Sequence, residues 1–130
     1  MVLPVTKIMR KKVATCKNTA SVYDAVKVLK KFNTSTVVIL ERGNIVGVFS
    51  ERDLVNKVVF AKKDPSTTSV LDVMSSPPVT APHTVTDIEI ASLIAKHHIT
   101  KVPIVKGNKV VGIVAEHDLL LHLAESVFEK

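Results

Sequence analysis

Two matching stretches decide the fold: residues 45–54 read Ile-Val-Gly-Val-Phe-Ser-Glu-Arg-Asp-Leu, and residues 110–119 read Val-Val-Gly-Ile-Val-Ala-Glu-His-Asp-Leu. They lie 65 positions apart, and the same glycine, glutamate, aspartate and leucine positions recur in both. In each stretch, β-branched residues lead directly into a Glu-x-Asp segment. This pattern predicts a strand that runs into the first turn of a helix.

The 65-residue offset aligns the chain with itself from Ile8 to Leu54 without a gap. It also places Met9 on Met74 and Val37 on Val102. An internal repeat of this kind predicts two copies of one supersecondary unit, packed together as a pseudo-two-fold pair. We assign residues 1–64 to the first copy and residues 65–130 to the second.

Each copy is expected to contain two helices. Ser21 with Asp24, and Thr86 with Glu89, have the spacing of a capping box, in which each side chain bonds the other residue's amide. Apolar residues follow at helical period, so a helix is predicted after each pair. A second helix is predicted to begin near Glu51 and, in the second copy, near Glu116.

Three strands complete each copy. A short segment precedes the first helix, and an apolar hairpin with a polar turn follows it. The expected strands are 13–15, 37–40 and 45–49 in the first copy and 79–80, 102–105 and 110–114 in the second. The predicted order is β-α-β-β-α, twice, which is an α+β fold.

Composition favours a folded protein that attracts anions. The chain has 130 residues, of which 46% are hydrophobic and 23% charged, so disorder is excluded. Its net charge is +6, which suits nucleotides, phosphates, nucleic acid or acidic partners. Cys16 is the single cysteine, which excludes an internal disulfide. With no long apolar run and no visible signal peptide, we expect a cytoplasmic protein.

The repeat resembles the CBS domain, named after cystathionine β-synthase, in its tandem form, the Bateman module. Three features carry the resemblance over about Ile8 to Ala124. These are the duplicated element order, the basic-h-Pro-h-h strand at residues 101–105, and the G-h-x-[ST]-x-x-D motif at residues 47–53. The chain resembles a free-standing module with no enzyme domain.

The resemblance implies a regulatory role. Modules of this family commonly bind adenosine-containing ligands in clefts between the two copies, so AMP, ADP or ATP is expected ahead of S-adenosylmethionine. The family also implies a homodimer through helical faces and a regulated protein partner. No catalytic function is expected, because no nucleophile elbow, HExxH or Gly-rich phosphate loop is present.

The resemblance assigns the ligand residues crosswise. In the primary cleft, Asp53 would accept bonds from ribose hydroxyls, Ser50 would bond ribose or phosphate, and the Arg52 guanidinium would bind phosphate. The second copy would contribute Lys101 and the backbone of Pro78, Val79 and Thr80. Asp53→Ala is then expected to remove most binding and leave the fold intact. A second interpretation is open, because Ser50 and Asp53 also have capping-box spacing and could simply start the helix.

The secondary cleft is expected to be weaker. Asp118 keeps the ribose position, but Ala115 has replaced the serine and His117 the arginine. Across the cleft the resemblance places Ala14, Thr15 and Thr36, and Thr36 stands where the second copy has Lys101. Losing a charge-assisted phosphate bond costs about 1.5–3 kcal/mol, so one good site and one weak or empty site are predicted.

Two other functions compete with this interpretation. Lysine and arginine clusters at residues 7–17, 27–31 and 57–63 could form a basic scaffold that binds RNA, DNA or a protein partner without a small ligand, although few aromatic residues lie among them. They could equally form a solvated face. The histidines at 97, 98, 117 and 122 do not have the spacing of a metal site, and those at 97 and 98 fit a helix end better.

Overall fold

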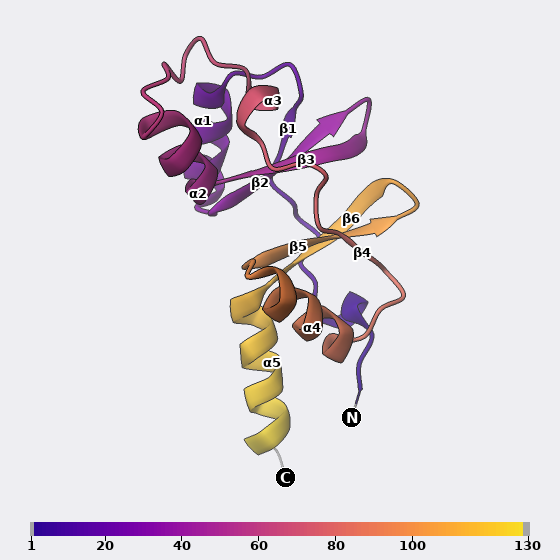
Figure 1. Ribbon diagram of the computed structural model, residues 1–130. Coiled ribbons are helices and arrows are strands. Elements are labelled where there is room, and N and C mark those ends of the chain that lie inside the picture. The colour runs from indigo at the N-terminus through magenta and orange to yellow at the C-terminus, as the bar shows by residue number, and fades with distance from the viewer. Residues whose placement is uncertain (1, 129–130) are drawn as a thin grey trace. The chain divides into compact units, whose positions relative to one another are not determined.

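The computed structural model describes residues 2–128, which form two compact units. The Asp53 unit comprises Val13–Pro78, and the Asp118 unit comprises Met1–Lys12 together with Val79–Lys130. Residues 2–12 therefore fold with the second sequence copy, and residues 65–78 fold with the first. The sequence boundary between residues 64 and 65 stays a prediction. Figure 1 shows the elements of both units.

The Asp53 unit follows the predicted β-α-β-β-α order. It contains β1 Thr15–Lys17, α1 Val22–Phe32, β2 Thr36–Glu41, β3 Asn44–Ser50, α2 Glu51–Asp53, η2 Leu54–Val59 and α3 Val70–Val73. β1 runs parallel to β2, and β2 runs antiparallel to β3. The second helix begins at Glu51 as predicted but continues as a π-helix over η2, a form that is frequent at functional sites.

The Asp118 unit repeats this order. It contains the 3-10 helix η1 Val5–Lys7, β4 Ala81–Pro82, α4 Asp87–His97, β5 Lys101–Lys106, β6 Lys109–Ala115 and α5 Glu116–Phe128. Its sheet has the order β4-β5-β6 with the same parallel and antiparallel pairings. The hairpin register shifts between Ile39 and Leu40 and again between Ile104 and Val105, 65 residues on. The predicted α+β class is confirmed.

Local sequence signals place the helix starts. Ser21 and Thr86 both form complete capping boxes, with Asp24 and Glu89 respectively. Each helix ends one residue before a left-handed residue, Asn33 after α1 and His98 after α4. The predicted helix-end position of His97 and His98 is therefore confirmed. The first strands begin later than predicted, because they pair with the interiors of β2 and β5.

Each unit has its own apolar core, and each core includes a valine from the segment that precedes the other repeat. Val70 is fully buried in the core of the Asp53 unit, and Val5 is fully buried in that of the Asp118 unit. Val70 N donates to Ala20 O, and Val5 N donates to Val85 O, at 3.0 and 2.8 Å. The repeat therefore extends N-terminally to segments 3–10 and 68–75, which dock in equivalent ways on different units.

Two methionines fix these segments against the sheets. A Cβ placed on Gly47 would lie 2.5 Å from Met74 Sδ, and one on Gly112 would lie 2.4 Å from Met9 Sδ. Any larger residue at either strand position would therefore force the docked segment to shift. The residue after each methionine pairs its backbone with the same strand, Ser75 with Val48 and Arg10 with Ile113. This docking positions the side chains of Ser75 and Arg10 for the sites described next.

Candidate functional site: two equivalent aspartates

Asp53 lies at the junction where β3 ends and α2 begins. Ser50 Oγ accepts a bond from Asp53 N at 3.2 Å, and Asp53 Oδ2 accepts from Ser50 N at 3.0 Å, which completes a capping box. The helix-start role considered for this pair is thus present in the structure. Asp53 is 5% exposed, unusually low for a carboxylate.

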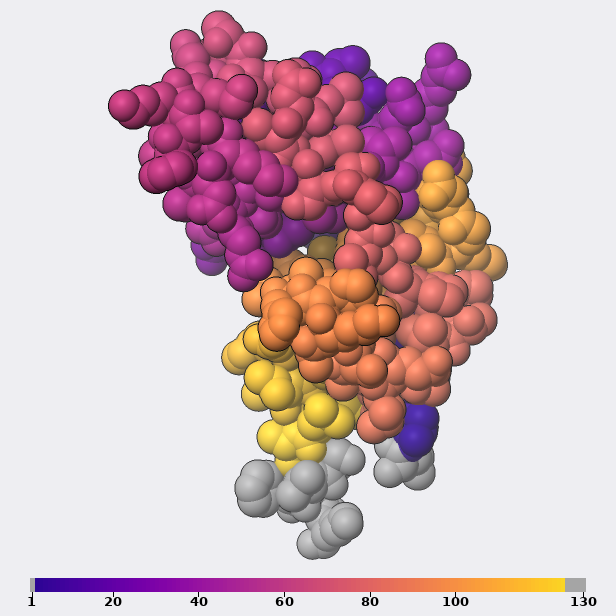
Figure 2. Space-filling model, in the orientation of Figure 1, coloured from indigo at the N-terminus to yellow at the C-terminus, as the bar shows by residue number. Residues whose placement is uncertain are grey.

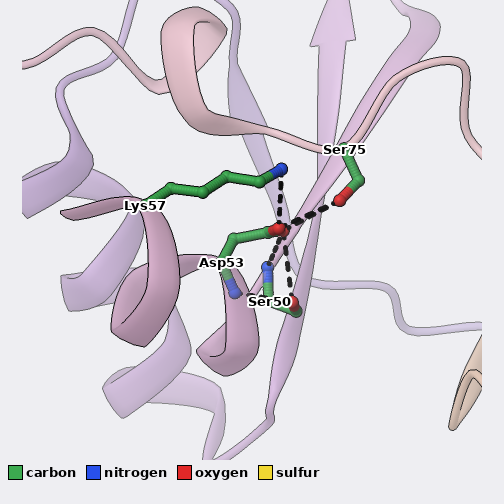
Figure 3. A network of polar contacts seen from close by, with 4 residues as sticks. All are labelled: Ser50, Asp53, Lys57 and Ser75. Carbon is green, nitrogen blue, oxygen red and sulfur yellow. Dashed lines mark hydrogen bonds and ion pairs between the residues drawn. The ribbon is translucent and has the colours of Figure 1, made fainter. Parts of the chain in front are cut away.

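The Asp53 carboxylate also accepts bonds from two serine hydroxyls and a lysine (Figure 3). Ser50 Oγ lies 3.1 Å from Oδ2, and Ser75 Oγ lies 3.0 Å from Oδ1 and 3.2 Å from Oδ2. Lys57 Nζ lies 3.0 Å from Oδ1, and the Lys57 side chain is 45% exposed. Both oxygens are satisfied, so a ligand hydroxyl must replace one of these donors.

Asp118 occupies the equivalent place at the start of α5 but has a different partner. Arg10 Nε lies 2.6 Å from Asp118 Oδ2, and Arg10 Nη2 lies 2.9 Å from Oδ1. The guanidinium therefore takes both carboxylate oxygens in a forked pair. Ala115 stands where the other unit has Ser50, so no side-chain hydroxyl is available at that position.

The hydrogen bonds from Arg10 lower the pKa of Asp118 below its ordinary value, against the opposing effect of burial. The charges of Arg10, His117 and Lys101 lower it further. In return, the bond and charge of Asp118 raise the pKa of Arg10. Asp118 is thus a carboxylate in a cationic surrounding.

Comparison with known proteins identifies the repeat. The CBS domain family matches residues 5–59 and 70–125. The chain belongs to the CBS domain family. Two CBS repeats make up a CBS pair, and such pairs are generally regulatory modules. No catalytic family is indicated over these residues.

Relatives agree with this assignment. The chain is 30% identical to the CBS domain-containing protein YhcV of Bacillus subtilis over 88% of its own length and 81% of that protein's. It resembles the hexameric CBS-CP12 protein of bloom-forming cyanobacteria with a TM-score of 0.86 and 30% identity, covering all of this chain and 77% of that one. A CBS domain protein of Thermoplasma acidophilum, TA0289, matches with a TM-score of 0.88 and 26% identity, covering 97% of this chain and 72% of that one.

Each cleft predicted from the CBS family draws on both units. Ser50, Arg52, Asp53 and Pro78 belong to the Asp53 unit, whereas Val79, Thr80 and Lys101 belong to the Asp118 unit. In the secondary set, His117 and Asp118 share a unit, and Ala14, Thr15 and Thr36 lie in the other. Both crosswise assignments therefore remain predictions.

Within single units, the structure brings other predicted residues together. Thr36 pairs with Ser50 across β2 and β3, so it lies beside the Asp53 capping box. Lys101 pairs with Ala115 across β5 and β6, which explains its electrostatic effect on Asp118. Arg52 is exposed on the same helical turn as Asp53.

Three residues that bond Asp53 or Asp118 were not predicted from the sequence: Arg10, Lys57 and Ser75. Lys57 follows Asp53 by four residues, a spacing that favours an ion pair on a helix. Arg10 and Ser75 are equivalent under the 65-residue offset, and both follow a repeated methionine. Those signals were available, but nothing local in the sequence shows that residues 8–10 dock on the second copy.

One of the predicted histidines, His122, contacts a buried carboxylate. His122 Nε2 lies 2.9 Å from Asp87 Oδ2, and this carboxylate at the start of α4 is 2% exposed. Burial raises the pKa of Asp87, but bonds from His122, Ile88 and Leu3 outweigh it, so the pKa is lowered. Within residues 2–128, no group of three or more His, Cys, Asp or Glu could hold a metal ion. No helix in the described part of the chain is long and apolar enough to cross a membrane.

Proposed function

We propose that this CBS pair is a regulatory module that binds an adenosine nucleotide, AMP, ADP or ATP, through Asp53, with Asp118 as a second, weaker site. Ligand binding would change how the module meets a protein partner, which is the role that the family suggests. S-adenosylmethionine is the second choice, because it lacks the phosphates that the cationic surroundings favour.

One observation carries the proposal. Two serine hydroxyls, Ser50 Oγ and Ser75 Oγ, donate to the Asp53 carboxylate at 3.1 and 3.0 Å. A ribose presents the same chemistry, two neighbouring hydroxyl donors. Exchanging a serine hydroxyl for a ribose hydroxyl keeps the number of hydrogen bonds, so the net cost of exchange is small.

The donors of Asp53 differ in how readily they can leave. Ser50 must remain to cap the helix, since its hydroxyl oxygen accepts from Asp53 N and its amide donates to this carboxylate. Lys57 is half-exposed and can turn into solvent, which uncovers Oδ1. A ribose would therefore approach Oδ1, with Lys57 or Ser75 displaced. Displaced Lys57 and exposed Arg52 would then be available to a phosphate.

A thermal-shift comparison tests this site. The stripped wild type, Asp53→Asn and the control Asp72→Asn are each melted with and without nucleotide, and every variant is compared with itself. Asp72 is an exposed carboxylate in the same unit. A ligand at a hundred times its Kd stabilises by about 2.7 kcal/mol, and we expect Asp53→Asn to lose most of this increment. An equal increment in all three proteins would contradict the role of Asp53.

We also propose that the module forms a homodimer through a helical face. Val55, Val59 and Phe60, in and just after η2, are 57%, 65% and 84% exposed. This segment reaches the surface of the Asp53 unit (Figure 2). Exposed apolar residues that cluster in this way mark interaction surfaces. The related CBS-CP12 protein is described as hexameric, so assembly of CBS pairs has a precedent.

The alternative of a nucleic-acid scaffold has less support. Each unit carries nine lysine and arginine residues and six acidic residues, so the positive charge is shared evenly. Several of these cations are already engaged by Asp24, Asp53 and Asp118. Retention of RNA or DNA with a steep salt dependence, and no response to nucleotides, would favour this alternative.

A further inference from the structure

Arg10 reaches Asp118 from a fixed backbone position. Arg10 N donates to Ile113 O at 2.8 Å, and Ile113 N donates to Arg10 O at 2.9 Å. The preceding residue, Met9, packs its sulfur against Gly112 on the same strand. The backbone of Arg10 is therefore held by contacts that do not involve its guanidinium. A substitution of the Arg10 side chain should leave the docking of residues 8–10 intact.

The guanidinium end of the Arg10 side chain lies at the protein surface. The Arg10 side chain is 65% exposed, whereas the Asp118 carboxylate is largely covered at 18%. A single exposed guanidinium thus occupies both oxygens of the carboxylate that is equivalent to Asp53. At Asp53, by contrast, the donors are two serines, a backbone amide and a lysine, and the serines are partly buried.

We propose that Arg10 is the gating and selectivity residue of the Asp118 site. It competes with ribose hydroxyls for Asp118, and once displaced it offers its guanidinium to the phosphate of the ligand. The site therefore favours nucleotides over nucleosides. This inference rests on the proposed function and specifies how one of the two sites discriminates among its ligands.

The charges around Asp118 explain the discrimination. The Asp118 carboxylate is paired with Arg10, and the charges of Lys101 and His117 also act on it. A nucleoside that takes Asp118 leaves the guanidinium without its anion and supplies no substitute. A nucleotide supplies a phosphate, which accepts the same forked pair of N–H donors that the carboxylate accepted. The phosphate ligand therefore restores the ion pair that the ribose breaks.

The Asp118 carboxyl carbon gives a direct readout of occupancy. Its NMR resonance in carbon-13-labelled protein is assigned with Asp118→Asn and followed during titration with adenosine and, separately, with AMP. The proteins compared are wild type, Arg10→Ala and the control Lys11→Ala, which removes a neighbouring exposed cation. The half-saturation concentrations give the AMP-over-adenosine selectivity of this site.

Arg10→Ala should change the half-saturation concentrations of adenosine and AMP in opposite directions. In Arg10→Ala, adenosine should half-saturate Asp118 at a concentration about two- to fivefold lower, because an exposed ion pair no longer competes. AMP should need a higher concentration, and the selectivity should fall by roughly tenfold or more, since a charge-assisted phosphate bond is lost. Lys11→Ala should behave as wild type.

Three results would overturn the inference. The first is an unchanged selectivity in Arg10→Ala, and the second is an equal fall in Lys11→Ala, which would show a general charge effect. The third is a response at Asp53 without any at Asp118, which refutes the gate and leaves the proposed function standing. If no resonance of any protein responds to either ligand, the proposed function fails and the gate fails with it.

Discussion

At the scale of single residues, Asp53 and Asp118 show how one repeated position acquires two different settings. The repeat places each at the first turn of a helix, but the neighbours 65 residues apart have diverged: Ser50 against Ala115, Ser75 against Arg10. Asp53 is held by hydroxyls, an amide and an ammonium, and Asp118 by a guanidinium fork. The partners of Asp53 complete a helix capping box, and the partner of Asp118 forms an ion pair with it.

The Arg10–Asp118 ion pair predicts how the stability of the fold changes at low pH. Because Arg10 lowers the pKa of Asp118, the pair stabilises the fold above the unfolded-state pKa of about 4, and this stabilisation is lost as pH falls through the lower folded-state pKa. Arg10→Ala should raise the pKa of Asp118 and weaken this dependence, by about 1 kcal/mol or less since Arg10 is exposed. Carbon-13 titration of Asp118 and urea unfolding at neutral and acidic pH measure both effects. An unshifted pKa would contradict the pairing.

Asp53 gives a prediction about stability. The network of Figure 3 changes the expectation that Asp53→Ala leaves the fold intact, because the substitution removes half of the capping box, the acceptor of Ser50 N, and leaves Ser75 without its acceptor. We expect a loss of about 2–3 kcal/mol in the free energy of unfolding. Asp53→Asn keeps an acceptor oxygen and should cost less. Chemical unfolding of both variants measures these losses. An Asp53→Ala variant that is as stable as Asp72→Ala would show that the network does not stabilise the fold.

At the scale of elements, the sequence predicted what depends on neighbours along the chain. Capping residues, apolar period and β-branched runs are local, so the starts of α1, α2, α4 and α5 and both hairpins were predicted correctly, whereas α3 and η1 were not predicted. The docking of segments 3–10 and 68–75 depends on contacts with distant strands, and it was missed. The networks around Asp53 and Asp118 were missed for the same reason, since Ser75 and Arg10 arrive through that docking.

The methionine–glycine contacts test this docking. Gly47→Ala places a Cβ 2.5 Å from Met74 Sδ and 3.0 Å from Ser75 O, so segment 68–75 must shift. We expect a loss of about 1–3 kcal/mol in the free energy of unfolding. Adding Met74→Ala should cost less in the Gly47→Ala background than in wild type, because the two residues then no longer collide. Strictly additive effects in this double-mutant cycle would show that the contact is absent.

At the scale of the whole molecule, the exposed face of η2 predicts self-association. Val59→Glu puts a charge among Val55, Val59 and Phe60 and should dissociate a dimer formed through this face. Light scattering at micromolar concentration should give wild type twice the 14.2 kDa mass of the chain, and the variant the mass of one chain. Thr67→Glu, an exposed position in the same unit, is the control. A wild-type protein that scatters as a monomer would refute the dimer.

The central claim, that this CBS pair senses an adenosine nucleotide, is tested most directly by calorimetric titration. The purified chain is stripped of co-purified ligand and titrated with AMP, ADP, ATP and S-adenosylmethionine. The account predicts saturable binding of at least one phosphate-bearing ligand at about one tight site per chain, with the Asp118 site weaker, and weaker or no binding of S-adenosylmethionine. Absence of heat with all four, confirmed by an unchanged melting temperature, would contradict it.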